Sequence, residues 1–511
     1  MIRPALLLRT LTLLGSAGTR LALEDPQGFL SKAKERVRTA DNRFLAGLPV
    51  SLLPDLPTGS SLARELIDRG ELSAGIEAIE GVAGQASRAE RHLGRITRQR
   101  LSQLRERPVP GIKAVAAAEA RVLYVLTNSQ PFTNSGYTVR TQSVLQAATE
   151  AGVPVHAVTR LAYPVLVGKI PSSLIQEVKG ISYERLLPWV YPRSLRSRDD
   201  LAVKMIVERA RRFNATILHT TTDFKNALVT SHAAAELGIP WVYEVRGELE
   251  GTWLSRRPAE QQEEAALSEF YRLAREQETR CCQAASAVVA LSEVSKQKLV
   301  DRGVAASKIQ VIPNAIEEQE VGRDYSRAEL RTELGLPEGS LIGSVTSVVD
   351  YEGLDTLIRA LEYLPEGTRV LIVGEGTARP ELEKLAKMLG VEDRVLFPGR
   401  KPQQEIWKWY ASLDVFVVPR KDTPVCRTVT PLKPLMAQAL GVPVVASDLP
   451  ALREVTGGLA EYTQAENPEA LARAISRVGS APEVGEWIRT RTWRHNGRRL
   501  FELYDSLHPK R

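Results

Sequence analysis

Residues 369–376 read RVLIVGEG, an uninterrupted apolar run that ends in two glycines separated by a glutamate. A run of this length and composition is typical of a parallel β-strand that is buried on both faces of its sheet. The residues that follow, TARPELEKLA, have the length and charge pattern of an amphipathic helix. We therefore predict a strand–turn–helix unit at this position.

Similar units recur along the chain in two series, which begin near residues 121 and 340. The apolar runs are RVLYVLT, VPVHAV, ATILHT, PWVYEV, ASAVVALS and IQVIPN, then LIGSVTS, RVLIVGEG, RVLFPG, DVFVVP and VPVVAS. Their alternation with helix-length stretches predicts an α/β protein with two doubly wound, Rossmann-like domains in tandem. We place the domains at residues 118–318 and 319–484, followed by a terminal segment at 485–511.

The N-terminal part lies outside this alternation. Residues 26–117 have a helical pattern without a clear strand or repeat period, which predicts a helical extension. Arg9 interrupts the leucine-rich residues 1–25, so their apolar pieces are shorter than the ~20 residues that a membrane span needs. Three alternatives stay open for them: a packed or frayed terminus, a helix that contacts a membrane surface, and a signal or anchor.

Charge and composition exclude several classes of protein. The 511 residues include 68 lysines and arginines against 61 acidic residues, and the net charge of +7 is spread along the chain. We see no concentrated basic stripe and expect no nucleic-acid partner. The three cysteines and six histidines show neither a disulfide framework nor metal-binding spacing. We therefore expect a cytoplasmic protein without a bound metal.

Glycines precede predicted helices in both domains. Gly136 follows the first strand of the first domain, and Gly374 and Gly376 follow a strand of the second. A glycine at such a place lets a ligand approach backbone N–H groups, and the helix start favours an anion. Turn chemistry alone also explains a single glycine of this kind. Two such turns predict that a cleft between the domains holds one phosphorylated ligand.

Positive charge gathers after the run DVFVVP. Arg420 and Lys421 follow directly, then Arg427, and Lys433 stands between two prolines at the start of a predicted helix. A guanidinium can bridge two phosphate oxygens, whereas a lysine acts as a point charge. We predict that these side chains line an anion site. The alternative is a set of solvated loop charges.

From about residue 120 to 505 the chain resembles glycosyltransferase family 4. The resemblance rests on motifs in the family's order, which are NSGYTVR, WVYEVRGELE, ALSEVSKQKLVDRGV, KIQVIPNAIE, YEGLDTLIRAL, VLIVGEG, VLFPGR, ASLDVFVVPR, VTPLKPL and GVPVVASDLPALREV. It implies the GT-B fold, in which two Rossmann-like domains face a cleft, and a final helix that crosses back onto the first domain. It also implies a retaining, metal-independent glycosyltransferase without a cofactor, whose co-substrate is a nucleotide diphospho-sugar. The acceptor would be a glycan, a lipid-linked molecule or another envelope component, at the inner face of the membrane if residues 1–25 contact it.

The resemblance implies that the nucleotide-sugar lies mostly against the second domain, the donor domain, with the acceptor entering from the first, and it implies roles for individual residues in binding that donor. Arg420 and Lys433 would grip the diphosphate, which the backbone at Gly136 would approach. The remaining candidates for nucleotide-sugar binding are Gly374, Glu375, Gly376, Thr430 and Glu454.

Three residues are candidates for the reaction itself: Arg246, His219 and Thr428. Arg246 matches the place where many relatives carry a histidine that faces the sugar, and the alternative is an ion pair with Glu248 or Glu250. His219 lies at the end of a predicted strand and is equally well explained as a core histidine.

The sequence departs from the family pattern at several positions. Two glutamates that are eight positions apart in many members correspond to Thr428 and Met436, and a thioether cannot take hydroxyl donors as a carboxylate does. The usual arginine and lysine near the start of the second domain fall on Ser347 and Glu352. These departures predict a divergent YEGLD/PLKP subgroup. They keep two alternatives open: a catalytically degenerate partner or scaffold protein, and a sugar-nucleotide epimerase of the same fold.

Overall fold

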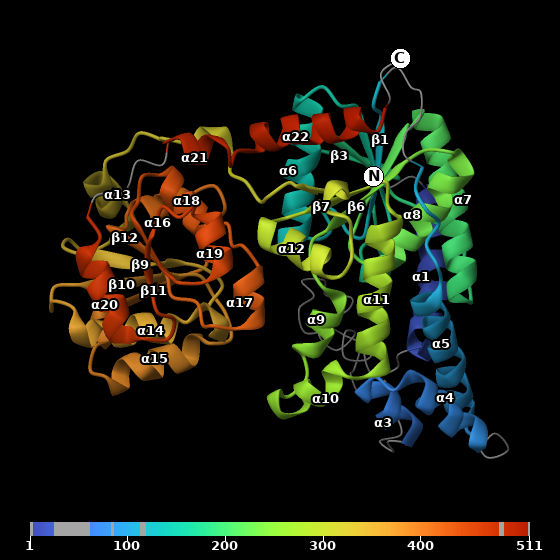
Figure 1. Cartoon of the computed structure of the whole chain (residues 1–511), viewed down its shortest axis with the longest axis horizontal. Coiled ribbons are helices and arrows are strands. Elements are labelled where there is room, and N and C mark those ends of the chain that lie inside the picture. The colour runs from blue at the N-terminus through green and yellow to red at the C-terminus, as the bar shows by residue number, and fades with distance from the viewer. Residues whose placement is uncertain (1–3, 25–61, 83–85, 113–118, 480–484, 509–511) are drawn as a thin grey trace. The chain divides into compact units, whose positions relative to one another are not determined.

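A computed structural model of the chain describes residues 4–24, 62–82, 86–112, 119–479 and 485–508. The described residues form two compact units, each built around its own sheet (Figure 1). Unit 1 comprises the described residues within Met1–Val289, Arg302–Gln310 and Glu502–Arg511, and unit 2 comprises those within Ala290–Asp301 and Val311–Phe501. The units are discontinuous along the chain: residues 290–301 belong to the second unit and the last residues to the first. The domains predicted from the sequence, 118–318 and 319–484, were each one continuous segment.

Unit 1 contains an eight-stranded sheet in the order β3-β4-β2-β1-β5-β6-β7-β8. Its strands are β1 (Val122–Leu126), β2 (Val155–Thr159), β3 (Ile175–Val178), β4 (Ile181–Glu184), β5 (Ile217–Thr221), β6 (Trp241–Val245), β7 (Ala287–Ala290) and β8 (Ile309–Val311). Every apolar run predicted for the first domain forms one of these strands. The pairs β1–β2, β1–β5 and β5–β6 are parallel, so the loops after these strands meet at one edge of the sheet.

The hairpin of β3 and β4 was not predicted. The two strands pair in antiparallel fashion across Lys179 and Gly180, which both have positive φ as a tight hairpin turn requires. β3 lies at the sheet edge and reads IQEV, an alternating pattern without a continuous apolar run. It therefore lacks the continuous apolar run that predicts a buried strand.

The helices given next follow or separate these strands along the chain, and the first three of them pack against the sheet. They are α6 (Gly136–Glu150), α7 (Leu195–Phe213), α8 (Phe224–Leu237), α9 (Leu249–Leu254), α10 (Gln262–Ala266) and α11 (Glu269–Ala284). Cys281 and Cys282 are free and buried in α11, as expected for packing residues.

The described residues before position 113, which include parts of the leucine-rich segment and of the predicted extension, are mainly helical and contain no strand. They contain α1 (Pro4–Glu24), α3 (Leu62–Arg69), α4 (Leu72–Gly81) and α5 (Arg88–Arg105). Gly70, with φ +96°, makes the turn between α3 and α4, and Ser87 and Glu90 form a capping box at the start of α5. Residues 26–61, 83–85 and 113–117 of the predicted extension lie outside the described residues.

Unit 2 contains a six-stranded sheet in the order β11-β10-β9-β12-β13-β14, and each pair of neighbouring strands is parallel. Its strands are β9 (Leu341–Val345), β10 (Arg369–Val373), β11 (Val395–Gly399), β12 (Val415–Val418), β13 (Val444–Ser447) and β14 (Glu461–Thr463). The five predicted runs form β9 to β13, and the three-residue β14 was not predicted.

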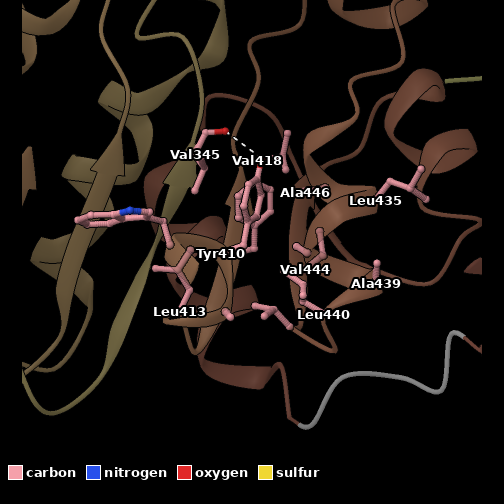
Figure 2. Close-up of a cluster of buried hydrophobic side chains, with 14 of the residues drawn as sticks. Val345, Tyr410, Leu413, Val418, Leu435, Ala439, Leu440, Val444 and Ala446 are labelled. Carbon is pink, nitrogen blue, oxygen red and sulfur yellow. Dashed lines mark hydrogen bonds between the residues drawn. The ribbon is translucent and has the colours of Figure 1, made fainter. Parts of the chain in front are cut away.

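Two helical layers cover the two faces of this sheet, and the alternation within β10 shows how. Leu371 and Val373 belong to a core with α16 (Ile406–Ala411) and α18 (Lys433–Ala439), whereas Val370 and Ile372 belong to a core with α14 (Leu354–Arg359), α15 (Arg379–Met388) and α20 (Pro468–Arg477). Figure 2 shows the first core, in which the Tyr410 hydroxyl donates to the carbonyl of Val345 at 3.3 Å. Burial on both faces explains why these strands read as continuous apolar runs.

The other helices of unit 2 are α12 (Glu293–Asp301), α13 (Arg327–Leu334), α17 (Pro424–Thr428), α19 (Pro450–Val455), α21 (Gly485–Arg489) and the first part of α22 (Trp493–Ser506). The last part of α22 packs in unit 1, where Tyr504 contacts Tyr124 and His219 through its hydroxyl. No helix in the described ranges is long and apolar enough to span a bilayer.

Candidate functional site

The candidate site of unit 2 lies in the loops beyond the carboxyl ends of β9, β10 and β12. Gly374 and Gly376, the glycines singled out in the sequence, let the loops after β9 and β10 approach each other closely. A Cβ atom added to Gly374, whose φ is +143°, would lie 1.8 Å from the carbonyl oxygen of Thr346, and one added to Gly376 would lie 2.0 Å from that of Val348. Both glycines therefore have a packing reason within the unit, and their approach to a ligand stays a prediction.

A third glycine positions a carboxylate. Gly353 has φ +68°, and a Cβ there would lie 1.9 Å from the carbonyl oxygen of Pro419. The absence of a side chain lets the short turn of Asp350–Glu352 lie against the end of β12. Glu352 is thereby held next to Arg420, the residue that follows Pro419.

Arg420 and Lys433 meet on this carboxylate. The Arg420 guanidinium donates to both oxygens of Glu352, at 3.0 and 3.3 Å, and to the carbonyl of Val429 at 3.0 Å. The Lys433 ammonium donates to Glu352 Oε1 at 2.5 Å and to the hydroxyl of Thr346. The two cations predicted to act together are therefore neighbours. We call Arg420, Lys433 and Glu352 the cationic cluster, because their formal charges sum to +1.

Burial differs within the cationic cluster. Arg420 is 5% exposed and Glu352 is 3% exposed, whereas the Lys433 side chain is 23% exposed. A ligand can therefore reach Lys433 directly, but it can reach the Arg420 guanidinium only if Glu352 or Val429 moves. The sequence prediction gave Arg420 a direct grip on a diphosphate. In the structure its hydrogen bonds hold Glu352 instead.

The cluster perturbs its own protonation equilibria. Burial would raise the pKa of Glu352, but the charges of Lys433 and Arg420 outweigh it and hold this pKa below its usual value. Burial lowers the pKa of Lys433, and the nearby Arg420 adds to this effect while Glu352 opposes it. The salt bridge itself favours an ionised Glu352.

Two of the remaining candidates of unit 2, Thr428 and Glu375, have partners within the unit. The Thr428 hydroxyl donates to the carbonyl of Pro424 at 3.0 Å, and Thr430 is half-buried in the same loop. The exposed Glu375 forms an ion pair with Arg379 at 2.5 Å. Their contacts with a nucleotide-sugar stay predictions.

The structure gives Glu454 and Met436 structural roles that the sequence did not show. The Glu454 carboxylate accepts from the backbone N–H groups of Glu293 and Val294, at 2.6 and 3.0 Å, and so caps the start of α12. Met436 is partly buried and packs against the core of Figure 2. Its thioether is thus a packing group at a position where a carboxylate was expected.

Unit 1 contains a second buried cluster, at the end of β6 and the start of α6. Glu244 is 1% exposed and forms ion pairs with Arg246 at 2.5 Å and with Arg140 at 2.7 Å. Arg246 also donates to the carbonyl of Tyr137 at 3.0 Å and to the Thr141 hydroxyl at 2.6 Å. The alternative reading of Arg246 as an ion pair was right in kind, but the partner is Glu244 rather than Glu248 or Glu250. The sequence did not show that Glu244 links two arginines, because this glutamate lies within the apolar run PWVYEV.

His219 has no exposed surface and is a core residue. Its ring stacks on Tyr124 with the centroids 4.4 Å apart, and its Nδ1 lies 2.8 Å from the Tyr504 hydroxyl. Burial lowers its pKa despite Glu244, whose carboxylate lies 3.7 Å from Nε2. The structure thus favours the second of the two readings, and a catalytic contact through this imidazole is inconsistent with its burial.

Gly136 begins α6, and a Cβ there would meet no atom within 4 Å. Ser135 caps the helix through its hydroxyl. Packing within unit 1 therefore does not require this glycine, unlike Gly374 and Gly376.

Among the described residues, no group of three or more His, Cys, Asp and Glu residues could hold a metal ion.

Comparison with known proteins covers both units. The family description "Glycosyl transferase 4-like domain" matches residues 135–315, and "Glycosyl transferases group 1" matches residues 339–480. Both units therefore carry glycosyltransferase domains. The match to a glycosyltransferase from Rickettsia africae ESF-5 has a TM-score of 0.56 at 16% identity and covers 76% of this chain and 99% of that one. Anabaena HepE in complex with UDP and glucose gives 0.53 at 19% identity, over 76% and 100%. The GT-B fold prediction is confirmed.

Sequence relatives are similar over a shorter region. The D-inositol 3-phosphate glycosyltransferase of Xylanimonas cellulosilytica is 36% identical over 183 residues, which are 34% of this chain and 43% of that protein. The GDP-mannose-dependent alpha-(1-6)-phosphatidylinositol monomannoside mannosyltransferase of Mycobacterium tuberculosis is 30% identical over 203 residues, 38% and 51% respectively. The matched region thus spans about half of these glycosyltransferases or less.

Proposed function

We propose that the protein transfers a sugar, with retention at the anomeric carbon, from a nucleotide diphospho-sugar to a glycan, lipid-linked or other envelope acceptor. One observation carries this proposal. The partly exposed ammonium of Lys433 stands at the first residue of α18, next to the loop after β9, in the unit that matches glycosyltransferases. In parallel sheets, ligands bind beyond the carboxyl ends of the strands.

The chemistry asked of this site is the stabilisation of a departing diphosphate. Lys433 would bind the diphosphate as a point charge, and Arg420 would keep Glu352 and the adjacent loop in place around it. Stabilising charge as it develops is an electrostatic task, and fixed cations can perform it without a metal ion. We place the activity in the cytoplasm, which is supported by the three free, buried cysteines.

Binding of nucleoside diphosphates in metal-free buffer tests the donor site. UDP and GDP are suitable probes, because HepE was solved with UDP and the mycobacterial relative depends on GDP-mannose. Titration calorimetry with EDTA present should show binding of one of them, and Lys433→Ala should weaken it at least tenfold. Lys387→Ala, an exposed lysine on α15, is the matched control and should leave the affinity unchanged. An unaltered affinity in Lys433→Ala would remove the proposed role of the lysine.

The second candidate function is a degenerate glycosyltransferase that serves as a partner or scaffold. It is favoured by Met436, whose side chain packs against the core, and by Glu352, which neutralises part of the cationic cluster. A screen of nucleotide sugars for release of nucleoside diphosphate separates the two functions. Turnover that Lys433→Ala abolishes supports the enzyme, whereas binding without turnover for every donor supports the scaffold.

A further inference from the structure

Helix α1 carries buried leucines on one face and exposed leucines on another. Leu6, Thr10, Leu13 and Ala17 are buried, and their spacing of three or four residues places them on one side of the helix. A neighbouring side carries four leucines that the described residues of unit 1 leave exposed, which are Leu7, Leu8, Leu11 and Leu14. The most exposed of them, Leu8, keeps 61% of its surface accessible.

The outer face of α1 lacks charge. Arg9 is the one charged residue between residues 4 and 18, and its guanidinium lies on the flank, 5.5 Å from the centre of the Trp189 ring. A surface helix of a soluble domain ordinarily turns polar residues outward. A row of exposed leucines on a folded helix instead marks a surface that another phase or molecule covers.

The loop after β4 lies beside α1, next to Arg9 and Ser16, and adds two exposed apolar residues. Trp189 and Val190 are 52% and 53% exposed, and the next residue, Tyr191, donates its backbone N–H to Ser16 Oγ of α1 at 3.0 Å. Exposed arginines follow at positions 193 and 196. Tryptophan beside arginine is the combination that favours the interface between hydrocarbon and headgroups.

Helix α5 packs against α1 and adds positive charge. Its exposed arginines are Arg88, Arg91, Arg95, Arg98, Arg100 and Arg105, and the helix contains a single acidic residue, Glu90. Arg98 and Arg105 form ion pairs with Glu80 and Glu269, so the other four supply the excess of positive charge. Basic side chains next to an apolar surface attract anionic headgroups within a Debye length. The charge of this neighbourhood therefore matches a negatively charged bilayer.

We propose that the outer leucines of α1, together with Trp189, Val190 and the neighbouring arginines, form a surface that docks on an anionic lipid bilayer. We call it the leucine–tryptophan surface. The chain would lie on the bilayer, with the leucines in the interfacial region and the arginines at the headgroups. The proposal goes beyond the proposed function, because it holds whether or not the protein transfers a sugar.

Vesicle sedimentation of the full chain tests the proposal. Vesicles of phosphatidylcholine with 30% phosphatidylglycerol should bind the protein at least tenfold more tightly than vesicles of phosphatidylcholine alone. The double variant Leu8→Glu/Leu11→Glu should lose most of this binding, since both side chains are exposed and each would carry a charge into the interface. The matched control is Leu267→Glu/Met388→Glu, which changes two exposed apolar residues elsewhere and should bind as the wild type does.

The positive charge has its own test. Arg193→Glu/Arg196→Glu should reduce binding to the anionic vesicles at least fivefold, and 0.5 M salt should weaken wild-type binding in the same direction. Equal partitioning of the wild type and the leucine variant, or no preference for anionic vesicles, overturns the proposal. Light scattering tests whether a second copy of the chain covers the leucines instead. A wild-type dimer that Leu8→Glu/Leu11→Glu dissociates, together with no vesicle binding, also overturns the proposal. Equal melting temperatures of all variants show that the fold is intact, and donor binding in these variants reports separately on the proposed function.

Discussion

Replacing Glu352 by glutamine should weaken the fold of unit 2 and strengthen its binding of anions. The carboxylate accepts three hydrogen bonds, two from Arg420 and one from Lys433, in a place where Arg420 and Glu352 are almost completely buried. Removing one partner of a buried ion pair leaves an uncompensated charge and costs about 3–5 kcal/mol. We expect the lower end, about 3 kcal/mol, because Lys433 keeps some access to water.

The assay has two readouts. Urea denaturation gives the free energy of unfolding, and hydrogen–deuterium exchange of β9 and β12 assigns the loss to unit 2. The affinity for a nucleoside diphosphate, measured without metal, should rise by about tenfold, since Lys433 and Arg420 lose the anion that they now share. Glu362→Gln, an exposed glutamate in the same unit, is the control for both readouts.

The pH dependence follows from the sign of the shift. The pKa of Glu352 is held below its usual value of 4.5 in the folded state by Lys433 and Arg420, against the effect of burial. Its stabilising contribution is therefore complete above pH 4.5 and is lost as the pH falls through the folded-state pKa. If Glu352→Gln lowers the free energy of unfolding by less than about 1 kcal/mol at pH 7, the ion-pair reasoning is refuted. An unchanged affinity would refute competition between Glu352 and a bound diphosphate.

Three further predictions concern other parts of the molecule. Burial, with the nearby charge of Asp223, raises the pKa of Glu278 to about 8, although hydrogen bonds from Tyr243 and from the Phe224 N–H lower it. The free energy of unfolding should therefore fall as the pH rises from 5 to 8, and Glu278→Gln should flatten that dependence in urea titrations. Gly374→Ala should lower the melting temperature of unit 2 through a loss of about 2–4 kcal/mol, because the new methyl group would overlap the Thr346 carbonyl, whereas Gly367→Ala, in open space, should change it little. Tyr504→Phe should cost about 1–3 kcal/mol of unfolding free energy, because it leaves the Tyr124 hydroxyl and His219 Nδ1 without their shared partner; a loss within error in denaturation curves would contradict this.

Much of the fold could be predicted because its strands are buried on both faces. That burial demands continuous Val, Ile and Leu runs, which are visible in one dimension. The β3–β4 hairpin and β14 could not be found in this way. The edge strand β3 alternates and carries polar residues, and β14 has only three residues, so neither has the continuous apolar run that predicts a buried strand.

The candidate site divides along the same line. Arg420 and Lys433 were recognised as a pair, since both follow one strand and prolines fix their loop. Glu352, the residue that links them, lies 68 and 81 positions away from them along the chain. The available signal was its place in the turn YEGLD after β9, where an acidic residue stands near the end of a buried strand. Its significance depends on Gly353, which lets that turn reach the carbonyl of Pro419.

The sequence by itself determined the two sheets, most of their strands, the helical extension and the presence of cations after β12, because apolar periodicity and turn residues are local properties. Only the tertiary structure decided which charges meet. It placed Glu352 between Arg420 and Lys433, put Glu244 between Arg140 and Arg246 and enclosed His219 in the core. Among the described residues, it also left four leucines of α1 exposed. Such contacts join residues that are distant along the chain, and their energies depend on burial, which only the packed chain establishes.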